Sequence, residues 1–153
     1  MLNFDPAQYL SVEQGAADLA DPIDEAIGRE FDKGLRNIAF WGVGGVAFLN
    51  MPAARLLQTS SPFPTYVDMG AEAILTDNVN VGPGTLVVFT SVSGTTKEAI
   101  TALEYAKKKG ARILTLVGTP DTPLAKLADI SFYNRCADPT SSENFYLQTL
   151  FVA

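Results

Sequence analysis

The sequence contains no histidine and a single cysteine, Cys136, among its 153 residues. The absence of histidine excludes a Ser-His-Asp triad and most zinc sites within this chain. One cysteine cannot form an intrachain disulfide, and without a histidine base it is interpreted as a small core residue rather than a nucleophile. We therefore expect a protein without a metal site, working in the reducing cytoplasm.

Positive charge and long apolar runs are also scarce. The chain has 11 Lys and Arg residues against 17 Asp and Glu, so its net charge is −6. This acidity argues against general binding to a nucleic-acid backbone. No apolar run approaches the roughly 18 residues that a membrane helix needs, and the N-terminus lacks the basic flank and apolar stretch of a signal peptide. The sequence therefore predicts neither a nucleic-acid partner nor a membrane partner.

From residue 21 onward, short apolar stretches alternate with helical patterns. The predicted strands are residues 37–41, 62–68, 85–89, 112–117 and 130–133, and the predicted helices are residues 21–34, 46–59, 96–109, 124–128 and 143–153, with a short helix or loop over 69–76. Continuous apolar strands separated by helices predict an α/β fold with a doubly wound, five-stranded parallel sheet and helices on both faces. We expect residues 1–20 to form an N-terminal arm and residues 21–153 a single domain.

A loop rich in hydroxyl groups follows the predicted strand at residues 85–89. It holds Ser91, Ser93, Gly94, Thr95 and Thr96 and leads directly into a helix. A helix N-terminus offers unpaired backbone N–H groups and a partial positive charge, and hydroxyls add further donors, so the loop predicts an anion site. Ser and Thr also cap helices and close turns without any ligand.

A second, glycine-rich loop follows the strand at residues 37–41. Gly42, Gly44 and Ala47 match the pattern G-x-G-x-x-A, and Asp68 ends the next strand, where a dinucleotide fold places a ribose-binding acid. Glycines are also common wherever a strand turns tightly into a helix. The spacing leaves an NAD-binding domain open as an alternative.

The hydroxyl-rich loop resembles the phosphate loop of the sugar isomerase (SIS) domain family, which has the pattern S-x-S-G-x-T. Here the loop reads Ser-Val-Ser-Gly-Thr-Thr over residues 91–96, followed by Glu98. The apolar strand at 112–117 and the phrase Thr-Pro-Leu-Ala at 122–125 also resemble the family. The likeness covers residues 37–153 and implies a flavodoxin-like SIS fold.

Within this family the chain is most similar to the first SIS domain of fructosamine-6-phosphate deglycases, of the fructoselysine-6-phosphate type, and to the isomerase half of glucosamine-6-phosphate synthase. The resemblance implies a phosphorylated sugar or fructosamine as the ligand, and no cofactor. It places the phosphate on Ser91, Ser93, Gly94, Thr95 and Thr96. It offers Gly44, Gly45 and Glu98 as sugar contacts, and Glu72 and Glu143 as weaker catalytic candidates. Glu98 is also interpreted as a capping-box residue.

Two valines depart from the family pattern. Val46 replaces a serine that usually reaches the ligand, and Val92 replaces a glutamine or histidine of the phosphate loop. Each loses a polar contact worth about 1 kcal/mol if the site is buried. Moving a proton between adjacent sugar carbons needs a base, and double-domain members take key acid–base groups from a second domain or a neighbouring subunit. We therefore expect a phosphosugar-binding domain of an isomerase or deglycase, with part of its catalysis outside this chain.

The last predicted helix, residues 143–153, is almost wholly apolar. Such a helix is normally buried, so it is expected to pack in a homodimer or against further chain. A non-catalytic module that senses a phosphosugar is the second hypothesis, although residues 1–35 are too short and too acidic for a preceding helix-turn-helix. The nicotinamide-cofactor protein is the third.

Overall fold

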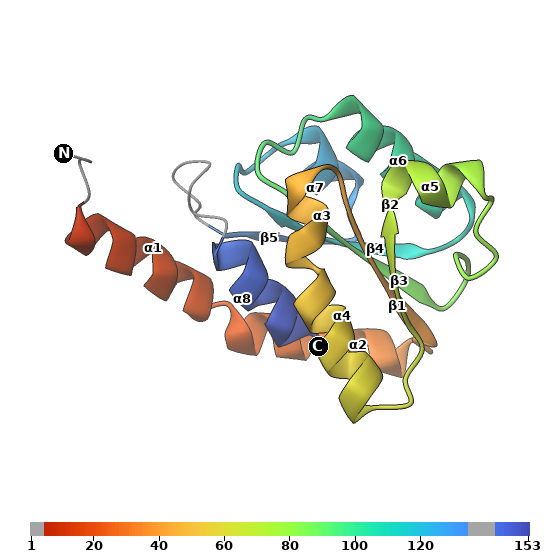
Figure 1. Ribbon diagram of the computed structural model, residues 1–153, viewed down its shortest axis with the longest axis horizontal. Coiled ribbons are helices and arrows are strands. Elements are labelled where there is room, and N and C mark those ends of the chain that lie inside the picture. Colours follow the sequence, from red (N-terminus) through yellow and green to blue (C-terminus); the bar gives the residue numbers. More distant parts are fainter. Residues whose placement is uncertain (1–4, 135–142) are drawn as a thin grey trace.

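The computed structural model describes residues 5–134 and 143–153. Its centre is a five-stranded sheet in the order β2-β1-β3-β4-β5, in which every neighbouring pair is parallel (Figure 1). The strands are β1 (Asn37–Gly42), β2 (Thr65–Met69), β3 (Thr85–Ser91), β4 (Arg112–Val117) and β5 (Ile130–Tyr133). The predicted parallel α/β sheet is therefore confirmed.

Burial explains why the central strands read as continuous apolar runs. Every residue of β3 is buried, and β1 and β4 are buried at every position after the first. A parallel strand that is covered on both faces has no solvent side on which to place polar residues. The edge strands β2 and β5 are only partly buried.

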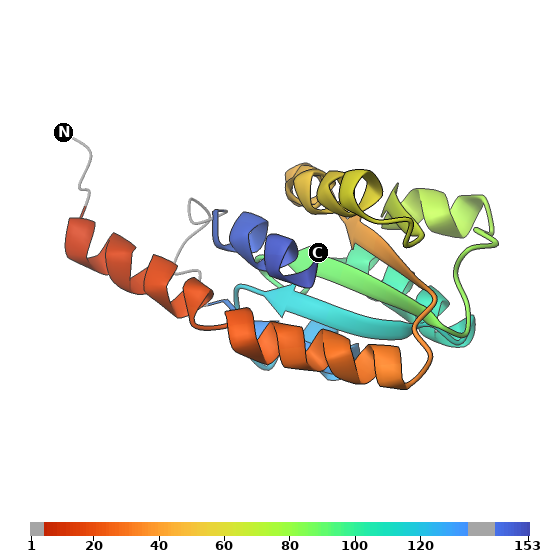
Figure 2. The ribbon, with the colours of Figure 1, turned by 90° about the horizontal axis from the view of Figure 1, so that it is seen from below.

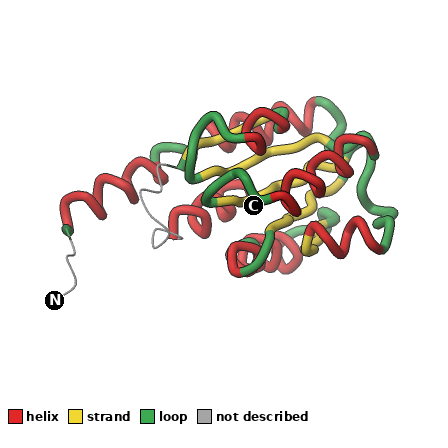
Figure 3. Tube along the Cα trace, turned by 90° about the horizontal axis from the view of Figure 1, so that it is seen from above, coloured by secondary structure: helices red, strands yellow, loops and turns green. Residues whose placement is uncertain are grey.

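Helices cover both faces of the sheet, as Figures 2 and 3 show. They are α1 (Pro6–Ala17), α2 (Ala20–Asp32), α3 (Gly45–Leu49), α4 (Met51–Ser60), α5 (Gly70–Leu75), α6 (Lys97–Lys108), α7 (Pro123–Leu127) and α8 (Glu143–Val152). One apolar core joins α2, α4 and α8 to one face of the sheet, and a second joins α5, α6 and α7 to the other. We call these the α2/α4/α8 face and the α5/α6/α7 face. The N-terminal arm is the helix α1, which extends away from the sheet (Figure 1).

The helix predicted over residues 46–59 is two helices, α3 and α4, which meet at Asn50. Pro52 stands in the first turn of α4, where its missing N–H leaves no hydrogen bond unmade. Strand β3 runs two residues further than predicted, because Thr90 and Ser91 still pair with β4. Ser91 therefore belongs to the end of a strand rather than to the loop.

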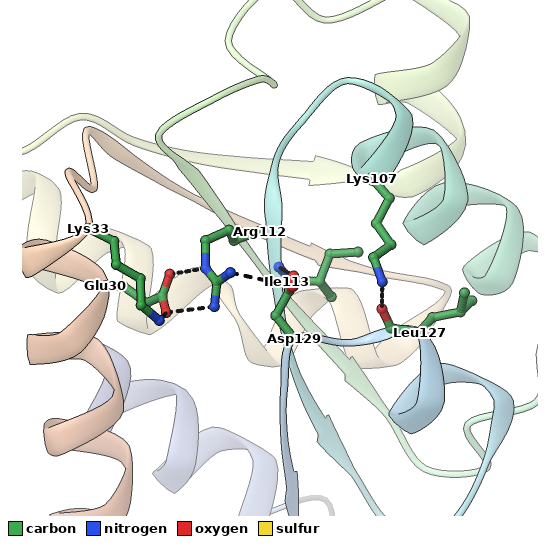
Figure 4. A network of polar contacts seen from close by, with 7 residues as sticks. All are labelled: Glu30, Lys33, Lys107, Arg112, Ile113, Leu127 and Asp129. Carbon is green, nitrogen blue, oxygen red and sulfur yellow. Dashed lines mark hydrogen bonds and ion pairs between the residues drawn. The ribbon is translucent and has the colours of Figure 1, made fainter.

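A network of ion pairs ties α2 to the sheet at the amino end of β4 (Figure 4). Glu30 of α2 is buried and accepts hydrogen bonds from Arg112 Nη2 at 3.0 Å and from Lys33 Nζ at 2.8 Å. The guanidinium of Arg112 also lies 3.5 Å from a carboxylate oxygen of Asp129. The other Asp129 oxygen accepts from the backbone N–H of Ile113 at 2.8 Å. The buried carboxylate of Glu30 thus links α2 to β4, and Arg112 extends the network to Asp129 just before β5.

Burial by itself raises the pKa of Glu30, but the hydrogen bonds and positive charges of Arg112 and Lys33 outweigh it and hold this pKa below its ordinary value of 4.5. A depressed carboxyl pKa stabilises the folded state fully above the unfolded-state pKa. This contribution is lost as the pH falls below 4.5 and through the lower native pKa.

We predict that Glu30→Gln lowers the free energy of unfolding at pH 7 by about 1–2 kcal/mol, a range reduced because Arg112 is partly exposed. Urea titrations at pH 7 and at pH 4 measure the change, and the difference from wild type should shrink at the lower pH. The matched control is Glu25→Gln, which removes an exposed ion pair with Arg29 on the same helix and should change stability by less than about 0.5 kcal/mol. A difference that does not depend on pH contradicts the assignment.

Candidate functional site

The candidate site lies at the carboxyl ends of β1 and β3, where the strand order reverses. After β1 the chain enters α3 and α4 on the α2/α4/α8 face, and after β3 it enters α6 on the opposite face. The two connections diverge and leave a crevice, which is where ligands bind in sheets of this type. A pocket of about 290 Å³ lies here. It is lined by Val43, Val46, Phe89, Thr90, Ser91, Val92, Ser93, Thr96 and Ala99.

Asn50 joins the ends of the two strands. Its Nδ2 donates to the carbonyl oxygen of Trp41 at 2.9 Å, and the hydroxyl of Thr90 donates to its Oδ1 at 3.3 Å. Asn50 and Thr90 are both fully buried, so these bonds satisfy an amide that would otherwise be costly inside the protein. The sequence reasoning missed Asn50. The available signal was a polar residue two positions before Pro52, within a segment that was interpreted as one helix.

The loop between β3 and α6 folds around its own hydroxyl groups. The backbone N–H of Gly94 donates to Ser91 Oγ at 3.1 Å, and that of Thr95 donates to Ser93 Oγ at 3.4 Å. Thr96 is the N-cap of α6, yet its side chain makes no capping hydrogen bond. The first-turn N–H groups of α6 therefore receive no acceptor from their cap residue. Such N–H groups, with serine and threonine hydroxyls beside them, suit an anion.

The connection between β4 and α7 braces this loop from outside. Gly94 has a φ of +63°, and a Cβ added there would lie 2.6 Å from the Cβ of Thr122. Leu124 N donates to the Gly94 carbonyl oxygen at 3.2 Å, and Gly118 N donates to the Ser91 carbonyl oxygen at 3.0 Å. Only glycine combines this positive φ with so close an approach. Thr122 was singled out only as part of a family phrase, and its packing role could not be read from the sequence.

The walls of the pocket are mostly apolar. The apolar residues Val43, Val46, Phe89, Val92 and Ala99 line it alongside the hydroxyl residues. No lining residue among those that the structure describes carries an ionisable side chain. The pocket can therefore hold an anion through neutral donors, but its own side chains cannot act as a general acid or base near neutral pH.

The other predicted phosphate and sugar contacts lie beside the lining residues. Gly94 and Thr95 stand between Ser93 and Thr96, and Gly44 and Gly45 stand between Val43 and Val46. Glu98 is exposed and is the second residue of α6. The capping-box interpretation of Glu98 is therefore wrong, because α6 begins at Lys97 and the box requires the third position after the cap.

The two catalytic candidates lie elsewhere. Glu72 is exposed in the first turn of α5, on the α5/α6/α7 face, and does not line the pocket. Glu143 is the first residue of α8, and its side chain is outside the described part of the structure. Cys136 also falls outside the described residues.

Asp68, which would bind the ribose if the chain were an NAD-binding domain, has a hydrogen-bond partner within the protein. Its Oδ2 accepts from Asn78 Nδ2 at 3.0 Å. Burial, followed by the negative charge of Glu72, raises the pKa of Asp68 above its ordinary value. A Cβ added at Gly42 would lie 2.7 Å from the Cα of Ala47, so this glycine is explained by a tight strand-to-helix turn.

A larger pocket of about 510 Å³ lies at the opposite edge of the sheet, around the amino ends of β1 and β3. Its two cationic side chains already have partners within the protein. Arg36 donates to the carbonyl oxygen of Pro83, and Lys109 pairs with Asp77 at 2.9 Å. Asp77 neutralises Lys109, whereas Arg36 keeps its positive charge. The carboxyl edge is the better candidate because ligands bind outside the carboxyl ends of the strands in sheets of this type.

Within residues 5–134 and 143–153, no group of three or more His, Cys, Asp or Glu side chains is arranged to hold a metal ion. None of the helices in the same residues has the length and apolar character that crossing a membrane requires.

Comparison with known proteins shows which family this fold and loop represent. The chain is 32% identical over 111 residues to the isomerizing glutamine–fructose-6-phosphate aminotransferase of Corynebacterium glutamicum, a match that covers 72% of this chain and 17% of that protein. It is 33% identical over 97 residues to an uncharacterised HTH-type transcriptional regulator of Caldanaerobacter subterraneus, covering 63% of this chain and 34% of the regulator. The chain thus spans less than a fifth of the aminotransferase and about a third of the regulator.

The fold is also found in solved structures. The C-terminal domain of glucosamine-fructose-6-phosphate aminotransferase from Francisella tularensis superposes with a TM-score of 0.70 and 19% identity, covering 92% of this chain and 46% of that chain. The family model of the SIS domain matches residues 34–153, which is most of the sequence. The chain therefore belongs to the SIS domain family.

Proposed function

We propose that this SIS domain binds a phosphorylated sugar, with the phosphate held at residues 91–96, which form the end of β3 and the loop after it. The observation that carries the proposal is the uncapped N-terminus of α6 beside a pocket of about 290 Å³. Backbone N–H groups of the first turn and the hydroxyls of Ser93 and Thr96 are the phosphate donors. The aminotransferase relative, whose name includes fructose 6-phosphate, supports this ligand class.

The first residue of α6 adds a positive charge at the same place. Lys97 is exposed and has no ion-pair partner among the described residues. A cation in the first turn of a helix opposes the helix dipole, so it is unfavourable unless an anion compensates it. A bound phosphate dianion supplies that compensation.

The activity we propose is that of a sugar-phosphate isomerase or a fructosamine-6-phosphate deglycase, both of which transfer protons between a substrate and acid–base side chains. The pocket itself has no ionisable lining residue. The acid and base must then come from Glu72, from Glu143, or from a second SIS domain or a second copy in a homodimer. We assign binding of the phosphate to this chain and at least part of the chemistry to those other groups.

The lack of an ionisable side chain among the described pocket-lining residues also favours a second candidate function. This candidate is a non-catalytic module that senses a phosphosugar. A sensor needs a ligand pocket but no acid or base, which fits the neutral lining. The likeness to an HTH-type transcriptional regulator supports this candidate.

We predict that Ser93→Ala raises the Kd for fructose 6-phosphate on the order of tenfold, because one hydroxyl donor to a charged phosphate is lost. Isothermal titration calorimetry measures the affinity. The thermal midpoint should not change, because Ser93 is exposed. Ser60→Ala, at the exposed end of α4, is the control and should bind as wild type does. Equal affinities in all three proteins would remove the loop from the site.

Gly94→Ala is expected to lower the free energy of unfolding by about 2 kcal/mol and to abolish binding of fructose 6-phosphate. The added methyl group meets both the positive φ and the side chain of Thr122. Gly28→Ala, in the middle of α2 with open space around it, is the matched control and should be neutral or slightly stabilising. Chemical denaturation and calorimetry together test both effects, and a Gly94→Ala protein that binds normally would show that the loop conformation is not needed.

Exchange of the sugar's carbon-bound protons with solvent distinguishes an isomerase or deglycase from a non-catalytic sensor. We predict that the 153-residue chain binds fructose 6-phosphate in D₂O without placing deuterium on the sugar, because no base lines the pocket. Proton NMR of the sugar measures the exchange. Deuterium incorporation that disappears in Glu72→Gln would instead assign the base to this chain.

A further inference from the structure

The pocket is lined by two kinds of residue, some with hydroxyl groups and some apolar. Its hydroxyl groups are confined to β3 and the loop that follows it, whereas three valines from both sides of the crevice form an apolar wall. Val43 and Val46 come from the connection after β1, and Val92 follows β3. Phe89 and Ala99 extend the apolar surface.

The hydroxyls of Thr90 and Ser91 are already partly engaged within the protein. Thr90 already donates to Asn50 at 3.3 Å, and Ser91 Oγ accepts from the N–H of Gly94 at 3.1 Å. The hydroxyls nearest the N-terminus of α6 are those of Ser93 and Thr96, which the proposed phosphate occupies. The side chains of the three valines offer no hydrogen-bond donor or acceptor.

We propose, on the basis of the proposed phosphate site, that this pocket selects phosphate monoesters whose carbons nearest the phosphate carry few hydroxyl groups, such as deoxy-sugar or alkyl phosphates. A ligand hydroxyl pressed against the valines loses its hydrogen bonds to water and gains none, whereas a methylene group gains from leaving water. The selection acts on the ligand body and leaves recognition of the phosphate unchanged.

The size of the pocket limits which carbon atoms of the ligand this selection can act on. About 290 Å³ is at the lower end for small-molecule sites. A phosphate and a short carbon chain fill such a volume, so the remote hydroxyls of a hexose lie outside it. Selection therefore applies to the first carbons after the phosphate ester.

Two commercial esters isolate this effect. n-Propyl phosphate and sn-glycerol 3-phosphate have the same charged group and three carbons, and they differ only in two hydroxyls. We expect wild-type protein to bind n-propyl phosphate on the order of tenfold more tightly in calorimetric titrations. Equal binding, or tighter binding of glycerol 3-phosphate, overturns the inference.

Isosteric variants test the wall directly. Val46→Thr and Val92→Thr keep the shape of each side chain and add one hydroxyl, so each should reduce the preference for n-propyl phosphate severalfold by improving glycerol 3-phosphate binding. Val79→Thr, at a side chain that is 91% exposed and far from the pocket lining, should keep the wild-type ratio. Thermal midpoints of all three variants verify that they are folded. Unchanged ratios in both pocket variants contradict the assignment.

Failure of this inference is distinguishable from failure of the proposed function. If fructose 6-phosphate binds and Ser93→Ala weakens it, but the two esters bind equally, the phosphate site stands and the apolar selection is wrong. If neither ester nor fructose 6-phosphate binds, both are wrong.

Discussion

The opposite directions in which the chain leaves β1 and β3 are the constraint on which the site depends. Right-handed crossovers send α3 and α4 to one face of the sheet and α6 to the other. The segments that follow β1 and β3 must therefore diverge at the carboxyl edge of the sheet, although the two strands themselves are paired. Asn50 spans the gap by bonding to Trp41 on one strand and Thr90 on the other. This bridge ties the carboxyl ends of β1 and β3 together beside the pocket.

The shape of that loop depends on packing outside it. Gly94 adopts a positive φ against Thr122, and backbone bonds from Gly118 and Leu124 hold the loop to the β4–α7 connection. A rigid loop of this kind can present preorganised donors to an anion without paying an ordering cost at the moment of binding. None of the described residues that line the pocket carries an ionisable side chain, so in the enzyme that we propose the acid and the base belong to other groups.

Much of the fold could be predicted from sequence because its signals are local. Strands β3 and β4 are buried on both faces, so each must be apolar throughout, and hydroxyl residues before α6 mark a helix start. What could not be predicted depends on distant contacts. Asn50 breaks a helical pattern and bonds to a residue nine positions earlier. Thr122, besides capping α7, packs against Gly94, a residue 28 positions earlier in the chain. Glu98 was assigned a cap role because the start of α6 was placed one residue too early.

The central claim is that a phosphate binds at the N-terminus of α6. The most direct measurement is a ¹⁵N NMR titration of the labelled chain with fructose 6-phosphate, read at each backbone amide. We predict saturable shifts concentrated at residues 93–99 and at Val43–Val46, with none at the amino-edge pocket around Arg36 and Lys109. Shifts centred on that opposite edge, or no saturable shift at residues 93–99, would contradict the claim.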